Sequence, residues 1–378
     1  MVSARSLMAL TSLAAASLVS AHAIDHSRLG KRAPSPLEVK LTAPTGDVAE
    51  IVATITNVGA EDLSLLAVGT ILDKHLPVER LAVSNEAGNR ETNTISARQG
   101  IEVPFKGVHI TLEHEALTSE HFELLKAGAS LQTVIDSTSV HSFDEVGTYA
   151  FEARGMLPYA LASSTQLRSS AAYQSNALRL AVADAPRGAA QSLRALDRRF
   201  NLQPGCTAAE EADMRTSLVN CQKLALAAAA DAADPSSKRF VEYFMTNASE
   251  TRRIVVDRLT AVARECANAD SGVRLFCNDF YNICEVYGPL VAYSVSSGPD
   301  TTVVCPLFWE RPGLTEECHK QDHATTIIHE ATHSESVYSP KTNDYAYSYP
   351  NSTQLEPWFA LRNADQYTLY ANAVHVNC

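Results

Sequence analysis

The pattern of apolar and polar positions predicts strands in the first half of the chain. Five segments are rich in β-branched residues or alternate in polarity, with turn residues between them: 37–41, 50–56, 63–69, 101–112 and 147–153. A helical pattern covers 119–127. We therefore expect a β-rich domain in this half, of the kind formed by a small sandwich.

The second half of the chain is predicted to be mainly helical. Four segments carry a helical pattern: 207–231, 237–248, 249–266 and 355–374. Two short β-branched runs, 291–295 and 301–305, predict strands that could form an edge beside a cleft. Asp322 is a suitable N-cap for a further helix that starts after it.

Composition and the N-terminal segment indicate where the protein acts. At 378 residues, with 46% apolar and 20% charged residues, the chain has the length of two ordinary globular domains. Residues 1–23 have the layout of a secretory signal peptide, with Arg5 before an apolar core and an A-x-A cleavage site at the end. No later apolar run is long enough to span a membrane. We expect a secreted, extracellular protein without a membrane partner.

Cysteine placement separates the two halves. All eight cysteines lie between Cys206 and Cys378, and an even count in an exported chain predicts disulfides. The segment 185–199 has the composition of a linker and ends in the dibasic pair Arg198-Arg199, a typical processing site. Cleavage there would leave 200–378, the half that is built to persist outside the cell.

One stretch of the second half carries metal chemistry. His329, Glu330 and His333 form an H-E-x-x-H, and residues four apart share one face of a helix. Both imidazoles can therefore bind one Zn²⁺, with Glu330 beside a water on that ion. A catalytic zinc needs a third protein ligand and one open position.

The third ligand has two candidates. The position six residues after His333 is Ser339, which excludes the third histidine of a metzincin. Glu356 lies at a workable distance for a gluzincin-like site, in which a glutamate from a following helix completes the set. Asp344, eleven residues after His333, is the other candidate.

The residues around Asp344 resemble a known motif. The segment 341–348 reads K-T-N-D-Y-A-Y-S and closely resembles G-T-x-D-x-x-Y-G, the signature of the deuterolysin family of fungal secreted zinc endopeptidases (aspzincins, neutral protease 2). The resemblance favours Asp344 as the ligand. Lys341 and Ser348 replace the two motif glycines; if such a glycine adopts a positive φ, its replacement costs around 1 kcal/mol.

The resemblance implies an α+β fold and a zymogen. It predicts a signal peptide at 1–23, a β-rich propeptide at 24–199 and a mainly helical, zincin-type catalytic domain with a short sheet at 200–378. It also implies one zinc ion per chain, held by His329, His333 and Asp344. Glu330 would take the proton of the attacking water, and Tyr347 would donate to the developing oxyanion.

The resemblance also extends to residues around this centre. Asp365 is expected either to hydrogen-bond a ligand or to line the substrate pocket, where it would bind a basic residue. Family-like spacing suggests three disulfides and leaves two cysteines as an additional pair. The expected pairs are Cys206–Cys277, Cys284–Cys305, Cys318–Cys378 and Cys221–Cys266. Six other histidines are expected to be structural or solvent-exposed: His109, His114, His121, His319, His323 and His375.

Charge indicates the class of substrate. Residues 200–378 hold 13 Lys and Arg against 22 Asp and Glu, a net charge of −9. An acidic cleft would attract basic proteins, and deuterolysins favour histone- or protamine-like substrates; solubility alone is the competing explanation of the charge. We expect a monomer whose partners are protein substrates and its own propeptide, without nucleic acid. Sequons at Asn247 and Asn351 allow glycosylation.

Two other functions stay open at this point. The first is a gluzincin-like peptidase that uses Glu356. The second is a catalytically silent secreted binding protein, which kept the fold while the motif glycines changed; the retained H-E-x-x-H, Asp344 and Tyr347 count against it.

Overall fold

The first half of the chain forms antiparallel sheets. The computed structural model describes residues 35–86, 101–162, 164–183, 202–267, 273–296 and 300–378; the predicted signal peptide and the linker with Arg198-Arg199 lie outside these ranges. The strands of this half are β1 (Leu37–Thr42), β2 (Ile51–Asn57), β3 (Leu63–Leu66), β4 (Ala82–Asn85), β5 (Ile101–Glu102), β6 (Val108–Leu112), β7 (Phe122–Leu125), β8 (Ser130–Ile135), β9 (Gly147–Glu152), β10 (Arg154–Leu161), β11 (Ser169–Gln174) and β12 (Leu178–Val182).

Three of the sheets are built from these strands alone. Their orders are β1-β2-β8, β11-β10-β3-β7 and β12-β9-β4-β5. Burial alternates along β2, where Ile51, Ala53 and Ile55 point inward, as expected for a strand with one face on a core. Apolar side chains from all three sheets, such as Leu65 and Phe151, form one core cluster.

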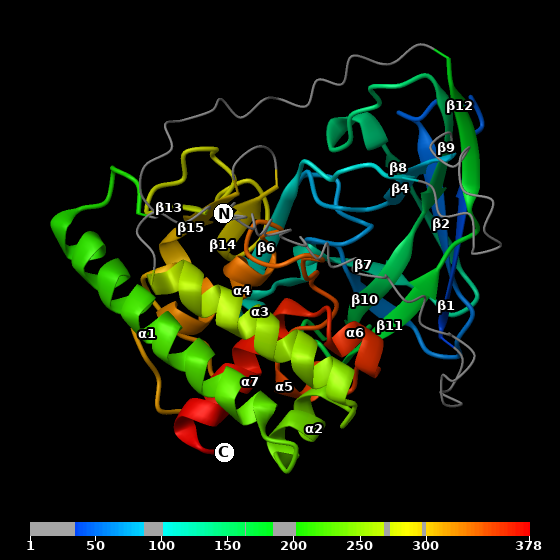
Figure 1. The fold of residues 1–378 in the computed structure, drawn as a ribbon. Helices are drawn as coiled ribbons and strands as arrows, with labels where there is room; N and C mark the ends of the chain where they lie inside the picture. The colour runs from blue at the N-terminus through cyan, green and yellow to red at the C-terminus, as the bar shows by residue number, and fades with distance from the viewer. Residues whose placement is uncertain (1–34, 87–100, 163, 184–201, 268–272, 297–299) are drawn as a thin grey trace, which may run out of the picture. The chain divides into compact units, whose positions relative to one another are not determined.

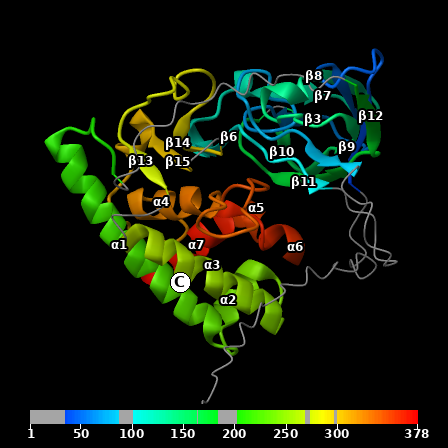
Figure 2. The same ribbon diagram turned by 45° about the horizontal axis from the view of Figure 1, so that its top comes forward.

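Residues 208–376 supply all seven α-helices of the described chain. They are α1 (Ala208–Ala233), α2 (Lys238–Phe244), α3 (Ser249–Ala267), α4 (His323–Thr332), α5 (Tyr349–Ser352), α6 (Pro357–Ala360) and α7 (Ala364–Val376), with the strands β13 (Arg274–Phe276), β14 (Leu290–Val295) and β15 (Thr301–Val304) between α3 and α4. Helices α1 and α3 lie side by side in Figures 1 and 2, and α4 contacts both α1 and α7. The expected α+β class is confirmed.

The fourth sheet joins the two halves. Its order is β13-β15-β14-β6, so that β6 from the first half pairs with β14 from the second (Figure 1). The pairing is antiparallel and places His109 opposite Ser294. The two predicted strands at 291–295 and 301–305 are confirmed as β14 and β15.

Two predicted helices differ from the structure. The helix expected at 119–127 is wrong: a single 3-10 turn, Ser119–His121, precedes β7, because 122–125 pairs with β3. The last helix, expected at 355–374, is divided into α6 and α7. The break lies at Asn363, whose side-chain amide bonds the backbone of the neighbouring loop instead of continuing a helix.

Four disulfides tie the second half together. They are Cys206–Cys277, Cys221–Cys266, Cys284–Cys305 and Cys318–Cys378, the pairs that the family resemblance implies. The second of them links α1 to α3, and the last joins the C-terminus to the segment that precedes α4. No helix in the described part of the chain is long and apolar enough to cross a membrane.

Candidate metal centre

The H-E-x-x-H lies on α4, a helix that is buried along its whole length. Asp322 caps its start, as expected: its carboxylate accepts from the Thr325 backbone N–H at 2.7 Å, and the Thr325 hydroxyl accepts from the Asp322 N–H at 2.8 Å. This capping box satisfies two donors at the buried start of the helix. The helix ends at Thr332, and His333 is its C-cap. His329 and His333 are therefore fixed one turn apart.

Asp344 lies against both histidines. Its Oδ1 is 3.0 Å from His329 Nε2, and its Oδ2 is 3.3 Å from His333 Nε2. All three side chains are nearly or fully buried. None of the three atoms His329 Nε2, His333 Nε2 and Asp344 Oδ1 makes a hydrogen bond of acceptable geometry among the described residues. Buried polar atoms without partners are costly, and a cation between them would satisfy all three.

The other ring nitrogens fix how the imidazoles point. His333 Nδ1 is 3.0 Å from the Thr342 carbonyl oxygen, and His329 Nδ1 is 3.3 Å from Asp365 Oδ1. Such outer partners set the tautomer and the orientation of metal-binding histidines. Asp365 is itself held, because it accepts from Gln321 Nε2 at 2.7 Å and from the Ser348 N–H at 2.8 Å.

The position of Asp365 favours one of its two expected roles, a contact with a proposed metal ligand, over a place in the substrate pocket. It is 1% exposed, and both of its oxygens contact groups of the protein. It faces the side of His329 that is turned away from Asp344. This geometry directs it towards His329, and its burial keeps it away from a substrate side chain.

The loop that carries Asp344 is held by α4 and by the start of α7. Thr342 and Thr332 join their hydroxyls at 2.7 Å, and Asn363 Oδ1 accepts from the backbone N–H groups of Tyr345 and Ala346. Ser348 has a φ of 67°, so one of the two replaced motif glycines stands at a positive φ. Lys341, the other replacement, is not among the positive-φ residues of the described chain.

The charges at the centre favour a cation. Burial lowers the pKa of His329, but the Asp344 and Asp365 carboxylates outweigh burial and raise this pKa to about 10. Burial would raise the pKa of Asp344, but the His333 and His329 imidazoles hold it well below its usual range. The carboxylates thus stabilise positive charge at this place, and a divalent cation can supply that charge.

Glu330 is held by hydroxyl groups of two strands. Its Oε1 accepts from Thr111 Oγ1 of β6 at 2.5 Å, and its Oε2 accepts from Ser294 Oγ of β14. Sequence reasoning missed both contacts. Neither hydroxyl carries a sequence signal, since Thr111 and Glu330 are 219 residues apart.

His109 is a third residue that sequence reasoning missed. Its ring stacks on His333, with centroids 4.5 Å apart and an interplanar angle of 7°. One potential ligand atom from each of His109, His333 and Asp344 lies within 4.8 Å of the others. Sequence reasoning treated it as an ordinary histidine, because a strand residue of the first half gives no hint of its contact with α4.

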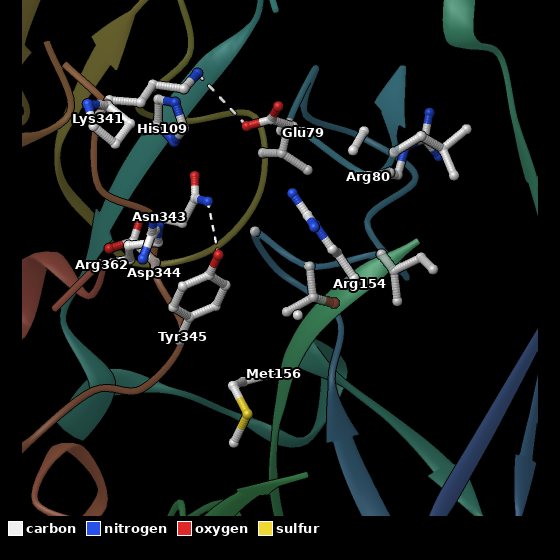
Figure 3. Close-up of a pocket in the computed structure, with 18 of the residues that line it drawn as sticks. Glu79, Arg80, His109, Arg154, Met156, Lys341, Asn343, Asp344, Tyr345 and Arg362 are labelled. Carbon is white, nitrogen blue, oxygen red and sulfur yellow. Dashed lines mark hydrogen bonds and ion pairs between the residues drawn. The ribbon is translucent and has the colours of Figure 1, made fainter. Parts of the chain in front are cut away.

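A pocket of about 350 Å³ opens beside this cluster. Figure 3 shows His109, Lys341 and Asp344 on one wall and Arg154 on another. Tyr347 lies outside this lining, 3% exposed in an apolar cluster with Ile110. Burial and the nearby carboxylates raise its pKa well above the ordinary value, so its hydroxyl stays protonated and can donate.

The remaining candidates lie elsewhere. Glu356 precedes α6 and makes no ion pair with either histidine of α4 among the described residues. His323 stacks on Phe308, and His319 stacks on Tyr349. His319 also lies near Cys318 and Cys378, but those two sulfurs form a disulfide and are not free to bind a metal.

Two buried imidazoles that both contact one carboxylate, beside a glutamate, define the class: a metal-dependent hydrolase centre of the H-E-x-x-H type. The model of the deuterolysin metalloprotease (M35) family matches residues 8–378. A neutral protease 2 homolog of Botryotinia fuckeliana is 39% identical, over 97% of this chain and 98% of that protein. Another, of Phaeosphaeria nodorum, is 37% identical over 98% and 97%. A solved zinc peptidase from Grifola frondosa has a TM-score of 0.34 and 18% identity, over 44% of this chain and 97% of that chain.

The chain belongs to the deuterolysin metalloprotease family and is a zinc metalloprotease.

Proposed function

We propose that this protein is a secreted zinc endopeptidase made as a zymogen. The signal peptide would be 1–23 and the propeptide 24–199, and cleavage after Arg199 would release the catalytic domain 200–378. The observation that carries the proposal is the contact of Asp344 with both His329 and His333, at 3.0 and 3.3 Å; both Nε2 atoms and Asp344 Oδ1 make no hydrogen bond of acceptable geometry among the described residues. These three residues are the proposed ligands, for one zinc ion per chain.

Each residue near the proposed zinc has a separate role in peptide hydrolysis. When bound, zinc would lower the pKa of a water molecule and polarise the scissile carbonyl. Glu330 accepts the proton of the attacking water and delivers it to the leaving amine. The hydroxyl of Ser294 orients one Glu330 oxygen, and the other, which accepts from Thr111 of the proposed propeptide, would become free for the proton when the propeptide is removed. Tyr347, protonated by burial, is the proposed donor to the developing oxyanion.

Asp365 acts on the ligand set rather than on substrate. Its carboxylate lies 3.3 Å from His329 Nδ1 and is fixed by Gln321 and Ser348, so it orients the imidazole. This replaces the alternative in which Asp365 pairs with a basic side chain of the substrate.

Secretion is supported by two features of the second half. Four disulfides are typical of an oxidising compartment. The sequon asparagine Asn247 is exposed and open to glycosylation, whereas Asn351 is 4% exposed, so a glycan on it does not fit the folded chain.

Basic proteins are the proposed substrate class. The net charge of −9 on 200–378 would attract cationic polypeptides and raise encounter rates at low salt. The test compares cleavage of a histone and of casein by the mature enzyme over a salt series. We expect faster histone cleavage that declines as salt rises. Equal rates at low salt, with no loss of histone cleavage at high salt, would leave solubility as the explanation of the charge.

The catalytically silent binding protein is the rival of another class. Cleavage of casein by the mature chain, its loss with a chelator and its return with zinc would exclude this rival. Glu330→Gln is the matched control, because it keeps the shape of the side chain and the three ligands but cannot take the proton. A zinc-loaded mature chain without proteolysis, or a Glu330→Gln chain with full activity, would contradict the proposed function.

A further inference from the structure

The inference concerns β6, which lies where the second half alone would leave an open strand. β14 is bonded to β15 on one edge and to β6 on the other. Beyond the strands, the Ser296 N–H donates to the Gly107 carbonyl at 2.9 Å and the Glu113 N–H to the Pro289 carbonyl at 2.8 Å. A segment of the first half thus adds a strand to a sheet edge of the second, the geometry by which extended peptides bind to edges.

One face of β6 is directed at the metal centre. Alternate residues of a strand share a face, so His109 and Thr111 point the same way. β6 contacts α4, and both of these side chains reach residues at its C-terminal end: Thr111 donates to Glu330, and His109 stacks on His333. The other face carries Val108 and Ile110 into an apolar cluster.

His109 has the features of a metal ligand rather than of a packed core residue. It is 6% exposed, and its Nε2 is buried without a hydrogen-bond partner among the described residues. A ligand atom of His109 lies within 4.8 Å of those of His333 and Asp344. His109 thus has a buried ring nitrogen that bonds nothing else among the described residues, and a ligand atom close to two of the proposed ligands.

We propose that His109 is a fourth ligand of the zinc ion held by His329, His333 and Asp344 in the uncleaved chain. This inference rests on the proposed function. Four protein ligands make a closed site, whereas a catalytic zinc site keeps one position open. His109 takes that position, and Thr111 takes the Glu330 oxygen that the attacking water needs. One strand therefore blocks both the metal and the base.

Side-chain contacts at each end hold β6 in place. After the strand, Glu113 accepts from Arg311 Nη2 at 2.9 Å and Nε at 3.2 Å, and the Arg311 side chain is 8% exposed. Before the strand, the Lys341 ammonium lies 4.4 Å from the Phe105 ring centroid and 3.5 Å from Glu79 (Figure 3 draws the Glu79 contact). Lys341 stands where the family motif has glycine, so this chain uses that position to hold the first half.

Removal of the first half would open the site by ligand exchange. His109 would leave the proposed ligands, a water molecule could enter in its place, and Glu330 Oε1 would lose the Thr111 hydroxyl and be free to accept a proton. No bond of the chain other than the processing cleavage is broken, and no electron is transferred.

The test counts the imidazoles on the metal, which needs no activity. X-ray absorption at the zinc edge is recorded for the uncleaved chain, kept intact by Arg198→Ala and Arg199→Ala, and for the mature chain. We expect three imidazoles in the uncleaved chain and two in the mature chain. Two imidazoles in both, with zinc bound and the mature chain active, overturns the inference and leaves the proposed function standing. Failure of both chains to bind zinc overturns the proposed function itself.

A substitution gives the matched comparison. In the uncleaved chain, His109→Phe keeps a ring against His333 but removes the donor atom, and His141→Phe is the control, since His141 is equally buried in the same half (1% exposed). We expect His109→Phe to lose one imidazole and to bind zinc at least about tenfold more weakly in a chelator competition. The control should change neither. Unchanged imidazole count and affinity in His109→Phe contradict the inference. If that variant fails to fold, the comparison of the uncleaved chain with the mature chain still tests the inference.

Discussion

Ser348 offers a quantitative test of the loop that carries Asp344. Its backbone has φ 67° and ψ 156°, a region that glycine adopts readily and other residues do not. Such a conformation costs a non-glycine residue about 1–3 kcal/mol. The Ser348 side chain offsets little of this strain, because it makes no capping hydrogen bond to α5. It accepts only a long hydrogen bond, 3.3 Å, from Asn351 Nδ2.

Ser348→Gly should therefore stabilise the protein. Removal of Cβ relieves the strain, while the greater freedom of glycine in the unfolded chain subtracts about 0.4–1 kcal/mol. The expected net gain is about 1 kcal/mol in the free energy of unfolding, seen as a higher urea midpoint at unchanged slope. Ser348→Ala is the control, because it removes the hydroxyl but keeps Cβ, and it should give no gain. A less stable glycine variant, or an alanine variant that gains as much, would refute the strain argument.

Three further predictions follow from buried contacts. Asp365→Asn should weaken zinc binding about 10–100-fold in a chelator competition, because the carboxylate that orients His329 is lost; an unchanged affinity would remove its positioning role. Arg258→Ala should lower the free energy of unfolding by about 3 kcal/mol or more, since this guanidinium, 1% exposed, donates to two backbone carbonyls at 2.8 and 2.6 Å; a urea midpoint near that of wild type would contradict this. Burial lowers the pKa of His323, so the folded state resists protonation of this side chain. The free energy of unfolding should therefore keep its full value above pH ~6.5 and decline below it. His323→Phe should reduce that decline in melts from pH 7 to 5, and an unaltered decline would assign it to other groups.

The parts predicted correctly are those with local causes. The α4 helix follows from the Asp322 cap and from the spacing of its histidines, both within a few residues. Asp344 was selected by a motif rather than by periodicity; the structure places it against both imidazoles, and its role as a metal ligand stays a prediction. The strand pair β14 and β15 follows from two β-branched runs.

The parts that sequence could not supply depend on distant pairing. Nothing near Thr111 indicates that its hydroxyl bonds a glutamate 219 residues away, and His109 is one histidine among 12. The segment 119–127 carries a helical pattern, but pairing of its second part with β3 outweighs local propensity. The break between α6 and α7 likewise depends on Asn363, which bonds the loop around Ala346.

The most direct test of the ligand set is the zinc content of two variants of the mature chain. Metal is measured by mass spectrometry after exhaustive dialysis, with folding checked by circular dichroism. The zinc content of Asp344→Ala should fall close to zero, because this substitution removes the carboxylate that faces both imidazoles. Glu356→Ala should keep about one zinc ion per chain. Zinc retained by a folded Asp344→Ala chain and lost from Glu356→Ala would contradict the account and assign the third ligand to Glu356.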